Sequence, residues 1–509
     1  MKRIVASLLA LLVLNPKAYS FCGFYVAKAD AKIFNKGSQV ILVRNGDKTT
    51  LTMSNDYQGD VKYFAMVIPV PVVLKEGDVK IANQALFDHF DSYSGPRLVS
   101  YYDQNPCYDY YSNNKYKRSM AYGAPESESK SMDIAESKVD HHVTIEAKYT
   151  VGEYDILVLS AKESTGLKDW LTESGYVLPA GAEAVLDPYI KNNLKFFVVK
   201  VNMEKFKTTG YQNLRPIQIT YESPKFMLPI RLGMANSTGS QDLIVYAFTK
   251  TGRVECTNYR TIKMPTGRNV PLDIQNNFGK FYKSVFKKQY NAESKNGVFL
   301  EYAWNVSPTY GQVKCDPCVG PPPVFAQLKE AGVDWLDAGN AGNVFFTRLH
   351  VRYTRDKFPQ DLFFQVTPNT ETFQARYIIT HPATGDFSCD GGQSYVRALA
   401  GKRRTEVNNL YALTGWNTEK YKTYIYEYNH FLGKQTDDED DESIYLTPVN
   451  DDGLGNRKIY LTGLLLAVLL FTFVFNPKRR KGNLPRYTGS SSLAHNLPQR
   501  EPGAEKNEA

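Results

Sequence analysis

The sequence lacks the short motifs that mark the commonest catalytic and nucleotide-binding sites. It contains no Gly-X-Ser-X-Gly nucleophile elbow, no phosphate-binding P-loop and no glycine-rich dinucleotide fingerprint. Its seven histidines are scattered and form no His-Glu-X-X-His metal motif. The adjacent His141 and His142 would point to opposite faces of a strand and could not share a metal ion. These absences exclude the enzymes that such motifs identify, and they leave enzymes whose carboxylate pairs have no spacing signature.

Excess charge is scarce outside the ends of the chain. The formal net charge is +8, with 61 Lys and Arg against 53 Asp and Glu. Residues 476–509 alone carry seven Lys or Arg against three Glu, and Lys2, Arg3 and Lys17 add three cations near the start. The central part of the chain is therefore nearly balanced in charge, which argues against a nucleic-acid partner.

The first twenty residues have the pattern of a secretory signal. A basic start is followed by eleven largely apolar residues and by small Ala18 and Ser20 at a cleavage site. Eleven residues are too few to cross the hydrocarbon core of a bilayer as a helix. We therefore expect a signal peptide that is cleaved after Ser20, with an uncleaved anchor as the alternative.

A second apolar run, from Ile459 to Phe475 (residues 459–475), contains no charge and has the length of a short transmembrane helix. A buried core helix is the alternative, but only thirty-four residues follow it. The positive-inside rule then predicts a single-pass type I protein of the cell membrane, with the ectodomain outside the cytoplasm. Membrane lipid would contact the helix and the basic flank, which consists of Lys478, Arg479, Arg480 and Lys481.

Length and composition suggest several subdomains between these ends. Roughly 415 residues lie between Phe21 and the acidic stretch that starts at residue 437, which is too many for one core of usual size. Six consecutive acids at residues 437–442 lack EF-hand spacing, so a self-repelling spacer is favoured over a calcium site. We divide the chain into a signal peptide (1–20), an N-terminal α+β subdomain (21–111), a flexible loop or linker (112–140), a main α+β region of two subdomains (141–435), an acidic linker (436–458), a transmembrane helix (459–475) and a basic cytoplasmic tail (476–509).

The hydrophobic patterns predict an α+β fold, mostly antiparallel β with several helices in the ectodomain, plus the C-terminal transmembrane helix. Asn45-Gly46-Asp47 lies between two apolar runs and predicts a hairpin of residues 38–44 and 49–53. Pro69 and Pro71 place the buried strand at residues 63–73 at an edge or exit of its sheet. Helical spacing of apolar residues predicts helices at 83–90, 167–174, 182–191, 275–289, 324–331 and 395–413.

The six cysteines of the mature chain are candidates for disulfides, because an even number in an exported protein is typical of them. They are Cys22, Cys107, Cys256, Cys315, Cys318 and Cys389. Fifteen pairings are open. Among these we favour Cys22 with Cys107, Cys315 with Cys318, and Cys256 with Cys389.

Cys315-Asp316-Pro317-Cys318 also has the spacing of a redox-active dithiol. However, a glycine and three prolines separate Cys318 from the next predicted helix, so the helix dipole would not lower the pKa of the Cys315 thiol. A structural disulfide is therefore favoured over an oxidoreductase site. Zinc would require a second pair of ligands at matching spacing, and the sequence contains none.

Long strings within residues 21–416 carry a family resemblance. They include Phe21-Cys22-Gly23-Phe24-Tyr25-Val26-Ala27, Met66-Val67-Ile68-Pro69-Val70-Pro71, Pro229-Ile230-Arg231-Leu232-Gly233-Met234, Glu301-Tyr302-Ala303-Trp304 and Thr347-Arg348-Leu349-His350-Val351-Arg352-Tyr353. Together they resemble the bacterial family of unknown function DUF2330. The resemblance implies a protein of the bacterial envelope, and it brings no activity, cofactor or catalytic residue to transfer to this chain.

We therefore expect a binding or scaffolding ectodomain of the bacterial envelope, with another envelope protein as its partner. The alternatives are an extracytoplasmic hydrolase with an acidic site and a dithiol oxidoreductase using Cys315 and Cys318. The sequence singles out no catalytic residue, no cofactor-binding residue and no metal ligand.

Overall fold

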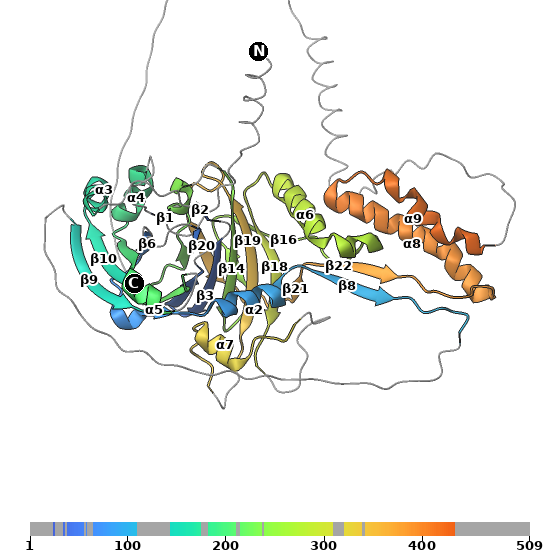
Figure 1. The fold of residues 1–509 in the computed structure, drawn as a ribbon, viewed down its shortest axis with the longest axis horizontal. Helices are drawn as coiled ribbons and strands as arrows, with labels where there is room; N and C mark the ends of the chain where they lie inside the picture. Colours follow the sequence, from blue (N-terminus) through green and yellow to red (C-terminus); the bar gives the residue numbers. More distant parts are fainter. Residues whose placement is uncertain are drawn as a thin grey trace, which may run out of the picture. The chain divides into compact units, whose positions relative to one another are not determined.

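The computed structural model describes residues 24–25, 34–35, 38–54, 57–58, 65–108, 143–174, 182–209, 214–236, 239–308, 320–337 and 342–432 (Figure 1). By its internal contacts the chain divides into two units, Met1–Ile444 and Tyr445–Ala509. All described residues belong to the first unit. The linker predicted at residues 112–140 lies outside the described residues, as do the signal peptide and the acidic linker.

A nine-stranded sheet forms the centre of this unit. Gly46 has a φ of +59° at the turn of its β3–β4 hairpin, so the predicted hairpin is confirmed. Eight strands follow one another in the order β16 (Arg260–Lys263), β18 (Gly297–Asn305), β19 (Phe345–Tyr353), β14 (Gln241–Thr249), β3 (Ser38–Asn45), β4 (Lys48–Met53), β12 (Ile217–Glu222) and β7 (Val79–Ile81), and β21 (Phe373–Gln374) pairs with β18.

A five-stranded antiparallel sheet packs against one face of the nine-stranded sheet. Its order is β1 (Phe24–Tyr25), β6 (Ala65–Val70), β11 (Lys195–Val201), β10 (Tyr154–Ala161) and β9 (Val143–Val151). In β6, Pro69 pairs with Phe196 of β11, whereas β1 pairs only with Met66 and Val67. At Pro69 the strand thus has one described neighbour, in agreement with the edge position predicted from its missing N–H group.

Alternating side chains of the two sheets build a layered core. Val40 and Leu42 of β3 pack with Ile68 and Phe197 of the five-stranded sheet, while Ile41 faces the other way. The outer face of the five-stranded sheet is covered by α3 (Ser164–Glu173) and α4 (Ala182–Lys191). The outer face of the nine-stranded sheet is covered by α2 (Gln84–Ser94), α6 (Phe278–Ala292) and α7 (Phe325–Glu330).

Two smaller three-stranded sheets flank this core. One is antiparallel and has the order β13 (Met227–Leu228), β20 (Leu362–Val366) and β15 (Val254–Cys256). The other is parallel and has the order β17 (Arg268–Asn269), β22 (Arg376–His381) and β8 (Arg97–Tyr102). The long helix α8 (Asp390–Thr414) packs on β17 and on α6. Figure 1 shows α8 beside α6 on the parallel sheet.

The remaining described elements are short. Strands β2 (Phe34–Asn35) and β5 (Tyr57–Gln58) form a two-stranded pair. The other helices are α5 (Met203–Thr209), α9 (Lys422–Tyr426), and the 3-10 turns η2 (Glu76–Asp78), η3 (Gly233–Asn236), η4 (Leu272–Asn276), η5 (Glu419–Tyr421) and η6 (Glu427–Phe431).

The fold-class prediction needs two corrections. The described residues do form an α+β fold with eight α-helices, but four strand pairs are parallel: β14–β3, β16–β18, β17–β22 and β22–β8. The transmembrane part of the prediction finds no support in the structure, because none of the described helices is both long and apolar enough to cross a membrane. Even α8, with 25 residues, contains Arg397, Lys402 and Arg403. Residues 459–475 themselves lie outside the described residues.

Candidate functional site

A buried charge network lies on the face of the nine-stranded sheet that α2 and α6 cover. The register of β18 shifts between Leu300 and Tyr302, so Glu301 occupies a bulge and has no partner residue opposite it on β19. Its side chain, only 1% exposed, accepts hydrogen bonds from Tyr282 of α6 (2.5 Å) and from Nε of Arg348 on β19 (2.6 Å). The bulge thus places one buried carboxylate within an otherwise apolar strand.

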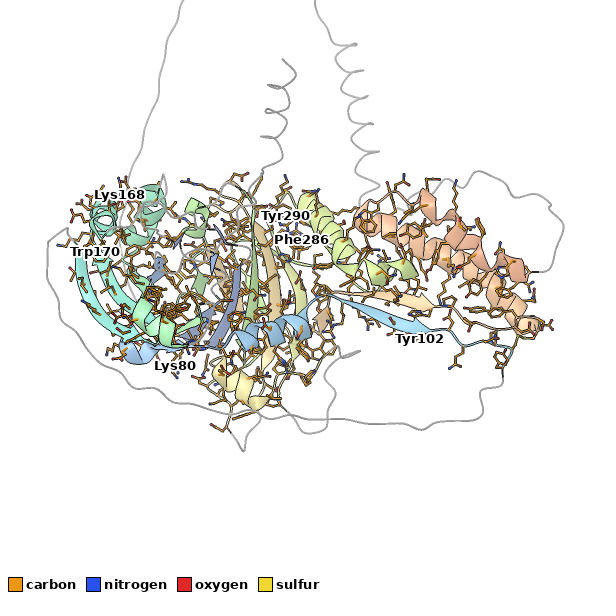
Figure 2. All side chains as sticks on the ribbon, viewed as in Figure 1. Lys80, Tyr102, Lys168, Trp170, Phe286 and Tyr290 are labelled. Atoms are coloured by element: carbon orange, nitrogen blue, oxygen red, sulfur yellow. A yellow bond between two sulfur atoms is a disulfide. The ribbon has the colours of Figure 1, made fainter. Side chains whose placement is uncertain are left out.

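His350 lies between two carboxylates of this network. Its Nδ1 is 2.9 Å from Oε1 of Glu301, and its Nε2 is 3.2 Å from Oδ1 of Asp242 on β14. The imidazole stacks on Phe286 with ring centroids 3.9 Å apart, and Figure 2 shows Phe286 and Tyr290 on α6. Because both ring nitrogens face carboxylate oxygens, the arrangement favours the protonated imidazolium, which donates from both.

The charges shift one another's pKa values in the expected directions. Burial alone would raise the pKa of Glu301, but His350 and Arg348 outweigh it and lower the pKa from 4.5 to about 2. Burial alone would lower the pKa of His350, and the carboxylates of Glu301 and Asp242 outweigh it and raise the pKa. The network therefore contains paired charges at neutral pH, and its interactions connect β18, β19, β14 and α6.

The raised pKa of His350 predicts a pH-dependent contribution to stability. This contribution is fully present below the unfolded-state pKa of about 6.5 and is lost as the pH rises through the higher folded-state pKa. Comparing wild type with His350→Gln in urea unfolding from acidic to alkaline pH should therefore show a wild-type advantage that shrinks with rising pH.

His89 provides a control of opposite sign. Burial lowers the pKa of this histidine, so its contribution is present above a pH of about 6.5 and falls as the solution is acidified. The difference between wild type and His89→Gln should grow more favourable to wild type with rising pH. Equal slopes for the two variants would contradict the assignment of His350.

A surface pocket of about 300 Å³ lies where η4 and the start of α6 meet the chain after α8. The end of α8 positions the aromatic side chain of this pocket. The helix is capped by Gly415, whose φ of +72° is favourable for glycine, and Trp416 follows directly. Lys288 of α6 donates to the last carbonyl groups of α8, at Tyr411 and Ala412, and favours that helix end electrostatically. The indole is then fixed by a 3.0 Å hydrogen bond from its Nε1 to Ser284 of α6.

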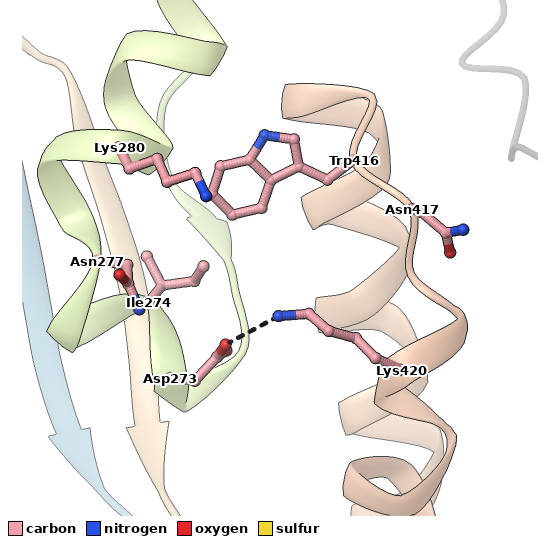
Figure 3. Close-up of a pocket in the computed structure, with 7 residues that line it drawn as sticks. All are labelled: Asp273, Ile274, Asn277, Lys280, Trp416, Asn417 and Lys420. Carbon is pink, nitrogen blue, oxygen red and sulfur yellow. Dashed lines mark ion pairs between the residues drawn. The ribbon is translucent and has the colours of Figure 1, made fainter.

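The pocket combines an aromatic ring with charges of both signs (Figure 3). Nζ of Lys280 lies 5.7 Å from the centroid of the Trp416 ring, within cation–π range. Opposite it, Asp273 accepts a hydrogen bond from Tyr421 (2.8 Å) and lies 3.8 Å from Nζ of Lys420. The lining residues are Asp273, Ile274, Asn277, Lys280, Trp416, Asn417 and Lys420.

The pocket offers no pair of acids for hydrolysis. Asp273 is the one carboxylate among the described residues that line it, and general acid–base catalysis on a glycosidic bond requires two. A second pocket lies between the end of α4 and strands β13 and β20, and Asp361 is the one acid among its described lining residues. No group of three His, Cys, Asp or Glu side chains within the described ranges is placed to hold a metal ion.

The cysteines pair differently from our prediction. Cys107 is bonded to Cys389, with Cα atoms 5.8 Å apart, and Cys256 is a buried free thiol. The pairings Cys22–Cys107 and Cys256–Cys389 are therefore wrong, because β8 and the start of α8 meet across 282 residues of sequence. Cys22, Cys315 and Cys318 lie outside the described residues, so the dithiol pair stays a prediction. The lipid-contacting flank of residues 478–481 also lies outside them.

Comparison with known families matches residues 16–365, more than half of the chain, to a family described as "Uncharacterized protein conserved in bacteria (DUF2330)". The chain belongs to the DUF2330 family. No curated protein and no solved structure matches it. The matched part of this DUF2330 protein contains the buried network and the α6 side of the tryptophan pocket, whereas Trp416 and Lys420 lie beyond its end.

Sequence reasoning missed the residues of the network and of both pockets. A usable signal existed for Glu301, since an acid within an otherwise apolar strand must find a partner when it is buried. A helix-ending glycine followed at once by tryptophan was a weaker signal for Trp416. No local pattern marks Asp242 or Asp361.

Proposed function

We propose that this DUF2330 protein is an exported binding protein of the bacterial envelope whose ligand is an acidic saccharide held on Trp416. The observation that carries the proposal is the combination of an indole ring and two ammonium groups in one pocket of about 300 Å³. This volume lies at the lower end of the range of small-molecule sites.

Each wall of the pocket suits one part of such a ligand. The indole of Trp416 offers a flat apolar surface for the C–H face of a sugar ring. Lys280 and Lys420 supply ammonium groups for a carboxylate. Asp273 and the amide of Asn277 offer acceptors and donors for hydroxyl groups. Because a hydroxyl both donates and accepts, this mixture of groups fits a sugar acid better than a simple anion.

The Cys107–Cys389 disulfide supports the extracytoplasmic location. Such bonds persist in oxidising compartments and are rare in the cytosol, where thiols are kept reduced. The bond joins two segments that also share hydrogen bonds, from Asn105 to the carbonyl groups of Thr384 and Asp386. An exported domain would meet envelope saccharides directly.

Calorimetric titration of the full chain with glucuronate and with glucose tests the proposal. We expect glucuronate to bind more tightly, because only its carboxylate pairs with the lysines. Trp416→Ala should weaken glucuronate binding about tenfold or more through the lost ring contact. Lys280→Gln should weaken binding of glucuronate more than that of glucose.

Lys283→Gln is the matched control, because Lys283 is an exposed lysine of the same helix that does not line the pocket. It should leave the affinity for glucuronate unchanged. Equal affinities for the two sugars would overturn the role of the lysines. Absence of binding, or binding that Trp416→Ala leaves intact, would overturn the proposal as a whole.

A further inference from the structure

The second pocket, of about 230 Å³, is built around a buried aspartate. It lies between the end of α4 and strands β13 and β20, on the side of the five-stranded sheet that α4 covers. Asp361 lines it and is only 5% exposed. A charged group buried to this degree is costly unless its oxygens have partners.

Donors of the described residues reach one oxygen of Asp361 and leave the other without a partner among them. Oδ1 accepts hydrogen bonds from the Tyr189 hydroxyl (2.7 Å) and from the backbone N–H groups of Ile230 (2.9 Å) and Arg231 (3.1 Å). Oδ2 accepts none from any residue that the structure describes. Burial accordingly raises the pKa of this carboxyl, although the hydrogen bonds and Arg231 oppose the shift. Oδ2 is therefore a strong acceptor that awaits a donor at the wall of the pocket.

Two cations complete the polar half of the pocket. The guanidinium of Arg231 lies 5.5 Å from the centroid of the Tyr189 ring, and no acid among the described residues forms an ion pair with it. Lys225 is exposed and likewise has no acidic partner within the described ranges. A carboxylate could pair with Arg231 while a neighbouring ammonium group reaches Asp361.

The other half of the pocket is apolar. Leu194 and Met227 are each less than one-tenth exposed, and Phe363 of β20 lies beside them. Removing an aliphatic side chain from water against these three residues would contribute favourably to binding. The pocket thus presents an acceptor, a cation and an apolar wall within a volume suited to a compact molecule.

We propose that this pocket binds a free amino acid with an aliphatic side chain. Its ammonium group donates to Oδ2 of Asp361, its carboxylate pairs with Arg231, and its side chain packs against Met227 and Phe363. This site is independent of the Trp416 pocket and does not require that the saccharide proposal hold.

Titration calorimetry of the full chain with L-leucine tests the inference. 4-Methylpentanoate lacks the ammonium group, 3-methylbutylamine lacks the carboxylate, and glycine lacks the side chain. We expect each to bind at least about tenfold more weakly than leucine, because each lacks the group that would contact Asp361, Arg231 or the apolar wall. Equal binding of leucine and 4-methylpentanoate would overturn the role of Asp361, and no binding of leucine would overturn the site.

Two variants locate the binding. Asp361→Asn removes the charge and should weaken leucine binding at least about tenfold while leaving the circular dichroism spectrum unchanged, which reports that the protein is still folded. Arg231→Gln keeps the backbone N–H that holds Asp361 and should produce a similar loss. Lys195→Gln, which changes a lysine next to lining residue Leu194, is the control and should have no effect. Leucine binding that survives both Asp361→Asn and Arg231→Gln would place it elsewhere and refute the inference.

Discussion

Replacing Glu301 with Gln is expected to lower the free energy of unfolding by about 3–5 kcal/mol. The substitution keeps the shape of the side chain but removes the carboxylate to which Arg348 and His350 are bonded. The side chains of these two residues are 7% and 14% exposed, so water cannot replace the lost partner. The cost is large because each buried cation loses its only fully buried partner and keeps one at a more exposed carboxylate, Asp91 for Arg348 and Asp242 for His350.

Denaturant unfolding of wild type and Glu301→Gln measures this loss. Glu371→Gln is the matched control, because Glu371 pairs with Lys263 at the surface, where its side chain is 56% exposed. Its removal should cost far less than that of Glu301, because a solvent-exposed ion pair contributes little to stability. Similar losses of stability in the two variants would contradict the large stabilisation attributed to the buried network.

Glu301→Gln should also change how the free energy of unfolding responds to acid. The pKa of Glu301 is lowered from 4.5 to about 2 in the folded state, so its contribution is present above a pH of about 4.5. It is lost as the pH falls through 2. Wild type should therefore lose its advantage over Glu301→Gln within this window, as followed by unfolding at a series of acidic pH values.

Removing the Cys107–Cys389 disulfide is expected to lower the free energy of unfolding by about 2–5 kcal/mol. The bond closes a loop across 282 residues of sequence, so in the chain-entropy account it restricts the unfolded chain strongly. The apolar cluster beside the bond is small, since its buried members among the described residues are Ala383, Phe387 and Val396. A small cluster of this kind contributes little burial energy of its own.

Thermal unfolding of Cys107→Ala/Cys389→Ala tests this expectation. Cys256→Ala serves as a control, because it removes a buried thiol that closes no loop. Dithiothreitol should lower the unfolding temperature of wild type toward that of the double variant, beyond any shift that the double variant itself shows. Identical responses of both proteins to the reductant would count against a stabilising bond between Cys107 and Cys389.

The sequence by itself determined those features whose cause is local. Helix α4 spans Ala182–Lys191, the range predicted from its apolar spacing, because the period at which apolar side chains recur depends only on neighbouring residues. The β3–β4 hairpin follows from one turn glycine for the same reason. Helix α8 was predicted to start at residue 395 but begins at Asp390, because the Cys389 side chain caps it ahead of two glycines. That start depends on where the disulfide holds Cys389.

The tertiary structure alone decided which distant residues meet. Asp242, Glu301 and His350 come from three strands, Trp416 joins Lys280 across more than a hundred residues, and Asp361 is bonded by Tyr189 of α4. Hydrophobic periodicity tells which face of an element is buried but carries no information about its partner. These contacts depend on strand order, on the β18 bulge and on the pairing of cysteines. Each of these features results from packing of the whole core. The candidate binding sites are products of that packing.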